Sequence, residues 1–146
     1  VKPKMILLTH THPDHAGGLG QLDNAFGCPT WVDKVEPRPS GSRDLRIVEE
    51  GTSITLGKLK IETISTRGHT PGGISYKINQ SVISGDAIFA GSMGRANSSW
   101  TDLFDSVTQN LLTLPENTRL YPGHGPATTV GEEKQHNPFF CGKVSL

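Results

Sequence analysis

The sequence contains little cysteine and no excess of charge of either sign. Its two cysteines, Cys28 and Cys141, lie far apart and outside any C-x-x-C spacing, so the sequence indicates neither a disulfide scaffold nor a zinc ribbon. Fourteen basic residues balance fourteen acidic ones. The protein therefore has no net charge that would attract it to nucleic acid or to an anionic membrane surface, and neither partner is expected.

Long apolar runs are also missing. No stretch approaches the roughly 18 apolar residues that cross a bilayer, and the N-terminus lacks the charged-then-apolar order of a secretory signal. We therefore expect a soluble protein of the cytoplasm, or of an organellar stroma or matrix, rather than a secreted one.

Glycine and proline are abundant, with 17 and 10 of the 146 residues. Together with 34% hydrophobic residues, they predict a globular protein rich in turns, and a chain of this length has room for one domain over residues 1–146. The chain starts at Val1 and enters the apolar stretch "MILL" almost at once. A buried strand normally has neighbours that earlier sequence supplies, so we expect the N-terminal part of the fold to be absent from this chain.

Hydrophobic periodicity predicts alternating strands and helices. Short apolar or alternating runs indicate strands, turns at 57–58 and 79–80 indicate two hairpins, and apolar residues three or four apart indicate helices. Strands are expected at 5–8, 29–33, 53–56, 59–64, 74–78, 82–83 and within "RLYPGHG", and helices at 14–26, 101–114 and 132–140. The strand at 5–8 is expected to be buried on both faces, and segment 34–44 to be an exposed loop. The order β-α-β-ββ-ββ-α-β-α is that of a mixed α/β domain.

Three histidines and an aspartate are concentrated in "THTHPDHAGG", at residues 9–18. They are His10, His12, Asp14 and His15. The stretch follows a predicted strand, where a site is expected in an open α/β sheet. Three imidazoles within six positions have little structural use, and neutral imidazole and carboxylate are ligands that suit zinc, iron or manganese. The motif by itself therefore favours a metal site over a polar loop.

Three more glycine-flanked loops each carry one candidate ligand: His69 in "RGHTPGG", Asp86 in "SGDAIF" and His124 in "YPGHGP". Taken singly, each histidine is more often a turn residue, and Asp86 a turn former or a helix cap. Two metals a few Å apart need about seven protein ligands with a bridging carboxylate, and the four loops together supply that number. His136 lies in a polar helical stretch without a glycine turn and is not expected to be a ligand.

In their order and spacing these motifs resemble the metallo-β-lactamase superfamily, and within it glyoxalase II and its short bacterial relatives. The resemblance rests on the H-x-H-x-D-H motif, on "GHTPG", on the segment from "GD" to "GSMGR", and on "PGHG" with a following threonine. It extends over nearly the whole chain. It implies an αββα sandwich that here lacks part of its N-terminal half, because several strands normally precede the H-x-H-x-D-H loop.

The resemblance also implies how the ligands divide between two divalent metal ions. The first metal would bind His10, His12 and His69, the second Asp14, His15 and His124, and Asp86 would bridge them. Zinc is the expected metal, with iron or manganese as alternatives, and a metal-bound hydroxide would attack the substrate. Asp14 is also expected to orient this nucleophile and accept its proton. Arg95 in "GSMGR" would be a catalytic or substrate-orienting cation, or alternatively a structural salt-bridge partner.

The implied function is that of a metallo-hydrolase acting on a small thioester or ester, with S-2-hydroxyacylglutathione as the favoured substrate. Glyoxalase II has a C-terminal helical region that helps to hold glutathione, whereas few residues follow "GEEKQHNPF" here, and Gly73 stands where such sequences often have a second histidine. One alternative is a mononuclear iron persulfide dioxygenase, which uses a related ligand set. Another is a truncated, non-catalytic remnant that binds metal or dimerises. Pairing of two chains into a homo-oligomer through an exposed sheet edge is a separate expectation.

Overall fold

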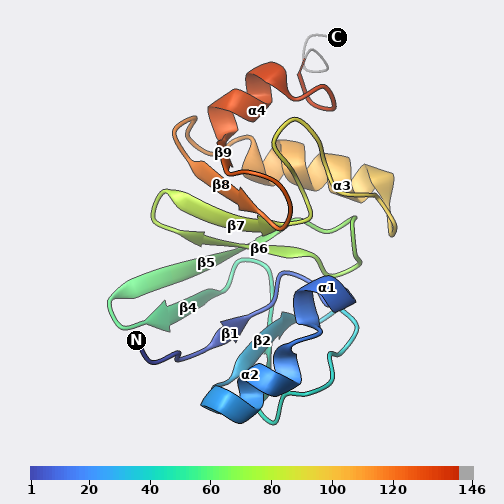
Figure 1. The fold of residues 1–146 in the computed structure, drawn as a ribbon. Coiled ribbons are helices and arrows are strands. Elements are labelled where there is room, and N and C mark those ends of the chain that lie inside the picture. The colour runs from blue at the N-terminus through green and yellow to red at the C-terminus, as the bar shows by residue number, and fades with distance from the viewer. Residues whose placement is uncertain (142–146) are drawn as a thin grey trace.

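The protein, seen in a computed structural model that describes residues 1–141, contains two β-sheets with helices beside each of them (Figure 1). The smaller sheet is parallel, in the order β1 (Ile6–Leu7), β2 (Thr30–Asp33) and β3 (Leu45–Val48). The larger sheet follows in sequence order with strands β4 (Ser53–Leu56), β5 (Leu59–Ser65), β6 (Ile74–Ile78), β7 (Ser81–Gly85), β8 (Arg119–Pro122) and β9 (Thr128–Thr129). Its neighbouring strands are antiparallel except for β7 and β8, which are parallel.

The two predicted hairpins are confirmed, and local turn chemistry explains them. Strands β4 and β5 pair across a turn at Gly57, whose φ is 59°, and β6 and β7 across a turn at Asn79, whose φ is 54°. Glycine and asparagine are the residues that most readily adopt this left-handed conformation. Alternation then puts Ile54 opposite Ile61, and both are buried.

Helices α3 and α4 cover the larger sheet beside β7, β8 and β9 (Figure 1). Helix α3 (Trp100–Ser106) continues into a π-helical turn at Val107–Leu111, and α4 spans Val130–His136. Each begins at a hydroxyl cap, since the Ser99 and Thr129 side chains accept hydrogen bonds from backbone N–H groups in the first turn. Their apolar faces and those of the strands form one core cluster, which includes Val82, Leu103, Val107, Leu120 and Val130.

A second core cluster lies between the sheets and fixes how they meet. Ile61, Ile74 and Tyr76 of the larger sheet belong to it, with Leu7 of β1 packed against them. The buried Tyr76 hydroxyl donates a 2.6 Å hydrogen bond to the Leu8 carbonyl oxygen, and burial raises the pKa of this hydroxyl. The Ile74 N–H donates to the carbonyl oxygen of Thr9 at 3.0 Å. These bonds hold the C-terminal end of β1 against the larger sheet.

The helix expected at 14–26 is two helices, α1 (Pro13–Ala16) and α2 (Leu19–Phe26). The break falls at Gly17 and Gly18, where two adjacent residues without side chains weaken a continuous helix. Helix α2 ends at Gly27 with a φ of 60°, the left-handed cap expected of a terminal glycine. The helix expected at 101–114 ends early in the π-helical turn, and the one expected at 132–140 spans Val130–His136, ahead of Pro138.

Other differences concern strands and burial. Strands β3 and β9 were not expected, and β1 is half-buried rather than buried on both faces. Segment 34–44 is mostly exposed, but Glu36 within it is buried. Tyr121 of β8 is only partly buried.

No helix within residues 1–141 combines the length and apolarity needed to cross a membrane. That residues 1–146 form one domain stays a prediction, and residues 142–146 of it lie outside the described part of the chain. The expected absence of N-terminal strands also stays a prediction.

Candidate metal centre

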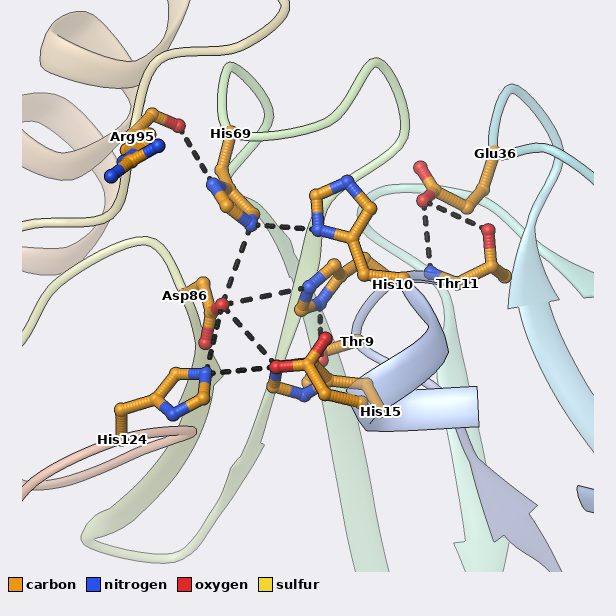
Figure 2. Close-up of polar contacts among 11 residues, drawn as sticks. Thr9, His10, Thr11, His15, Glu36, His69, Asp86, Arg95 and His124 are labelled. Atoms are coloured by element: carbon orange, nitrogen blue, oxygen red, sulfur yellow. Dashed lines mark hydrogen bonds and ion pairs between the residues drawn. The ribbon is translucent and has the colours of Figure 1, made fainter. Parts of the chain in front are cut away.

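All seven candidate ligands meet where the ends of the two sheets come together (Figure 2). Four come from the segment that leaves the smaller sheet: His10 follows β1, His12 caps α1, and Asp14 and His15 lie on α1. The other three come from the larger sheet, with His69 between β5 and β6, Asp86 directly after β7, and His124 after β8. The parallel pairing of β7 with β8 puts the ends of those two strands, and so Asp86 and His124, at the same edge.

The ligand atoms form two groups. His10, His12 and His69 make one group, and Asp14, His15, Asp86 and His124 make the other. Within each group the ligand nitrogen and oxygen atoms all lie within 4.8 Å of one another. Six of the seven residues fall into the groups that the sequence resemblance implies, and Asp86, the implied bridge, is placed with the second group.

One carboxylate oxygen lies between the two groups. Asp86 Oδ2 is 3.7 Å from His10 Nε2 and 3.4 Å from His69 Nε2, both of the first group. It is 3.2 Å from His15 Nε2 and 3.4 Å from His124 Nε2, both of the second. Asp86 is only 7% exposed, so this central carboxylate is largely shielded from solvent.

Hydrogen bonds orient two of the imidazole rings. The Arg95 carbonyl oxygen lies 2.7 Å from His69 Nδ1, and since a carbonyl only accepts, Nδ1 carries the proton. The lone pair of His69 is therefore on Nε2, which faces His12 Nδ1 at 3.1 Å. A contact of this kind with a carbonyl is an arrangement by which proteins fix a metal-ligating tautomer. The Thr9 hydroxyl, which can donate or accept, contacts His10 Nδ1 at 3.1 Å, and His10 Nε2 is directed at the centre (Figure 2).

The protonation states favour ligands over ion pairs. Burial, assisted by the neighbouring imidazoles, lowers the pKa of His10 to about 3, so His10 is neutral near pH 7 and forms no ion pair with Asp86. Burial acts to raise the pKa of Asp14, but its own backbone N–H and the nearby His15 and His124 outweigh this and lower it. His10 thus presents a neutral imidazole and Asp14 an ionised carboxylate, the forms in which these side chains bind divalent cations.

Three buried polar atoms in the centre test whether a metal fits. His10 Nε2, His15 Nε2 and Asp86 Oδ1 have no hydrogen-bond partner among residues 1–141. An unsatisfied buried polar group lowers the stability of a fold by about 1–3 kcal/mol. Three such atoms side by side bring no structural benefit. Coordination of a cation would satisfy such atoms, and the imidazole and carboxylate donors suit zinc, iron or manganese. The residues present therefore fit a divalent metal centre.

Glycine at position 123 leaves room for the central ligands. A Cβ there would collide with Asp86 Oδ1 and would lie 2.6 Å from His15 Cε1. Backbone of the His124 loop thus reaches the centre only because it carries no side chain at this point.

Replacing Gly123 with alanine is therefore expected to displace Asp86 or His15 and to weaken metal binding by about tenfold or more, the usual effect of disturbing the support of metal ligands. Zinc affinity measured by competition with a chromogenic chelator checks this. Gly125→Ala is the matched control, because a Cβ there meets open space, although its φ of 79° adds some strain. Equal affinities in both variants would contradict the steric argument.

Arg95 contacts the centre through its backbone rather than its side chain. Its carbonyl oxygen orients His69, whereas the side chain is exposed and makes no ion pair with an acidic residue of the described chain. Both expected roles of the Arg95 side chain, as a substrate-orienting cation or as a structural salt-bridge partner, stay predictions. His136 is exposed on α4 and belongs to neither ligand group, and both cysteines are free.

A cavity of about 430 Å³ opens beside the first ligand group. His12 and His69 line it, with Pro37 and Pro71 as apolar walls. Further lining comes from the polar residues Thr11, Glu36, Thr70, Asn97 and Ser98. The cavity therefore lies against two ligands of the first group. Of these residues Glu36 was missed by sequence reasoning, because a glutamate in a polar, proline-containing segment gives no sign of burial.

Comparison with known proteins agrees with this geometry. Residues 1–124 match the family model described as "Metallo-beta-lactamase superfamily". The chain belongs to this superfamily. Its members bind divalent metals and include many metallo-hydrolases. The predicted family and fold are thereby confirmed.

Two relatives align with most of the length of this superfamily member. "Probable metallo-hydrolase YqgX" of Bacillus subtilis (strain 168) is 35% identical over 162 residues, covering 96% of this chain and 77% of the relative. "Hydroxyacylglutathione hydrolase GloC" of Haemophilus influenzae is 32% identical over 163 residues, with the same coverage of 96% and 77%. Both names describe hydrolases, and one names a thioester substrate.

Solved structures share the fold over nearly the whole chain. The crystal structure of the BLEG-1 B3 metallo-beta-lactamase has a TM-score of 0.86 at 33% identity and covers 97% of this chain and 79% of its own. That of TTHA1623 in a di-iron-bound form has a TM-score of 0.82 at 32% identity and covers 96% and 79%. The second of these superfamily members holds two metal ions of a kind other than zinc.

Proposed function

We propose that this chain is a dinuclear metallo-hydrolase that cleaves a small thioester, with S-2-hydroxyacylglutathione as the favoured substrate. The observation that carries the proposal is the position of Asp86 Oδ2, which lies within 3.7 Å of imidazole nitrogens from both ligand groups. A carboxylate placed in this way can bridge two cations. The relative named as a hydroxyacylglutathione hydrolase supports the choice of substrate.

The chain supplies a set of ligands for each of the two metals, which we take to be zinc, with iron or manganese as alternatives. His10, His12 and His69 would hold the first, Asp14, His15 and His124 the second, and Asp86 both. When bound, two such cations provide Lewis acidity that lowers the pKa of water toward about 7 and polarises a carbonyl group. The remaining work belongs to protein side chains.

Asp14 is the proposed catalytic carboxylate. Its side chain is 57% exposed, and its Oδ2 lies 3.1 Å from His124 Nε2 and 3.4 Å from His15 Nε2. It therefore faces both the centre and the solvent from which water and substrate arrive. In this position Asp14 can orient an attacking water and accept its proton.

The cavity beside His12 and His69 is the proposed substrate site. Besides the two histidines, its walls are two prolines, Glu36 and several uncharged polar side chains, and none of its lining residues is a lysine or arginine. An uncharged acyl or thioester group fits these walls better than a carboxylate does. Arg95 is exposed two residues before Asn97, a lining residue, and we propose that it meets an anionic part of the substrate outside the cavity.

Hydrolysis of S-D-lactoylglutathione by the zinc-loaded protein tests the proposal. We expect turnover in the wild type and a loss of turnover of about a thousandfold or more in His12→Ala. The reason is that His12 would help to hold a cation whose stabilisation of transition-state charge is worth several kcal/mol. His136→Ala, an exposed histidine outside both groups, is the matched control. A fully metal-loaded wild type that cleaves no thioester, or that cleaves only a chromogenic β-lactam, would overturn the proposed substrate.

Metal content and turnover together separate this function from the alternatives. A mononuclear persulfide dioxygenase would hold one iron per chain and consume oxygen with glutathione persulfide, and the complete second ligand group argues against it. A non-catalytic remnant would bind metal without turnover. Pairing of two chains through a sheet edge, and the absence of nucleic-acid and membrane partners, stay predictions.

A further inference from the structure

Two buried glutamates lie outside both ligand groups. Glu36 is 3% exposed and Glu133 is 2% exposed. Neither forms an ion pair with a lysine, arginine or histidine within residues 1–141. A buried carboxylate without a cation is costly unless hydrogen-bond donors surround it. In both cases donors come from segments that carry the proposed metal ligands, and Glu133 also accepts from Asn137 at the end of α4.

Glu36 joins the two loops of the first ligand group. Its Oε1 accepts hydrogen bonds from the Thr11 N–H at 3.0 Å and the Thr11 hydroxyl at 3.3 Å, and Figure 2 shows both contacts. Its Oε2 accepts from the Gly72 N–H at 2.9 Å. Thr11 stands between His10 and His12, and Gly72 lies in the loop of His69. One carboxylate therefore connects the sources of all three ligands.

Glu133 on α4 does the same for two loops of the second group. Its Oε1 accepts from the Gly91 N–H at 2.7 Å, and its Oε2 from the Thr128 hydroxyl at 2.6 Å. Gly91 lies in the loop that Asp86 begins, and Thr128 ends the loop that carries His124.

Asn137 extends the Glu133 contact toward a ligand. Its Nδ2 donates to Glu133 Oε1 at 3.0 Å and to the Ser92 carbonyl oxygen at 2.9 Å. Ser92 and Phe89 exchange backbone hydrogen bonds, and the Phe89 ring meets the His124 ring edge-on with centroids 5.8 Å apart. The contacts of α4 thus reach the second ligand group.

We propose that Glu36 and Glu133 are positioning residues, each of which sets the spacing of one ligand group. The inference rests on the proposed metal centre and adds a division of labour within it. Glu36 holds together the loops of His10, His12 and His69, and Glu133 those of Asp86 and His124. Without either carboxylate, binding of a cation must itself reassemble the loops, and the affinity of that group falls.

The hydrogen-bond chemistry predicts different outcomes for the same substitution at the two sites. Both oxygens of Glu36 face backbone N–H groups, so Glu36→Gln puts an amide N–H against another donor in either orientation. At Glu133, Oε2 faces a hydroxyl, which can turn and accept from an amide. Glu133→Gln is therefore expected to be tolerated, whereas Glu133→Ala removes every contact.

Zinc titration of the metal-free protein, followed by long-range ¹H–¹⁵N NMR of the histidine rings, tests the proposal. Each ring reports its own group, and no turnover is needed. In Glu36→Gln we expect about tenfold weaker zinc binding at His12 and His69, with a smaller change at His15 and His124. Glu133→Ala is expected to reverse this pattern. Glu133→Gln and the exposed Glu49→Gln are controls expected to resemble the wild type.

Several outcomes would overturn the proposal. If the wild-type rings bind two zinc ions and both test variants bind them equally well, the glutamates do not position the ligands, although the metal centre stands. Equal losses at both groups in each variant would show general destabilisation instead. If wild-type rings do not respond to zinc, the metal centre itself fails. Should Glu36→Gln or Glu133→Ala not fold, Glu36→Asp and Thr128→Val, which shorten or remove one contact, serve the same comparison.

Discussion

Replacing Asp86 with alanine is expected to lower thioester hydrolysis by about a thousandfold or more and to deplete zinc from both ligand groups. The physical reason is that Asp86 Oδ2 lies 3.2–3.7 Å from histidine nitrogens of both groups. The substitution would remove one ligand from each cation. It would also remove the negative charge that balances the positive charge of the two cations among the four imidazoles. A thousandfold loss of rate means that the activation free energy rises by several kcal/mol, since about 1.36 kcal/mol changes a rate tenfold. Steady-state kinetics and elemental analysis on the same samples measure both quantities.

Two further variants make the Asp86 result specific. Asp86→Asn keeps the shape and one carbonyl oxygen, so it should retain more metal than the alanine variant. Asp105→Ala, an exposed aspartate on α3, should behave as the wild type. Retention of two zinc ions per chain in Asp86→Ala would show that Asp86 does not bridge the two groups.

The metal-free protein is expected to lose stability as the pH falls from about 6.5 toward 3, and His10 is expected to cause much of this loss. Burial lowers the pKa of folded His10 to about 3 from an ordinary value of 6.5. Between these values the unfolded chain binds a proton that the folded chain refuses, so the free energy of unfolding falls with pH. The expected decrease from pH 7 to pH 4.5 is about 2–3 kcal/mol from this residue.

Urea denaturation in the presence of a chelator measures this effect. His10→Gln should show a correspondingly smaller decrease in unfolding free energy between pH 7 and pH 4.5. His136→Gln is the matched control, because its ring is exposed on α4, and it should retain the wild-type slope. An unchanged slope in His10→Gln would mean that the other ligands, rather than buried His10, set the acid sensitivity.

Local sequence signals predicted the parts of the fold that depend on near neighbours. The hairpins at Gly57 and Asn79 follow from short turns between alternating strands. Strand β3 escaped prediction because only Val48 of its four residues is buried, and it pairs in parallel with β2, across a long connection. Such non-local pairing leaves little trace in a short polar segment.

For the site, the sequence predicted the candidate ligands but not the residues that support them. Four glycine-flanked loops identified all the candidate ligands, because imidazoles and carboxylates at strand ends form a pattern that packing does not require. The pattern could not tell that Arg95 meets His69 through its carbonyl oxygen, since this depends on backbone geometry. It also gave no sign of Glu36 or Glu133, whose roles arise only from tertiary contacts.

The origin of the ligands from both sheets has a mechanical consequence. A cation held by His12 and His69 would join positions 57 residues apart in the chain, and one held by His15 and His124 would close a still longer loop. Cross-links that close long loops, such as disulfides, lower the conformational entropy of the unfolded chain most. This protein has two cysteines, both free. The proposed metal ligands are therefore placed to serve as reversible cross-links, and removal of a bound metal would loosen the seam between the sheets beside the cavity that His12 and His69 line.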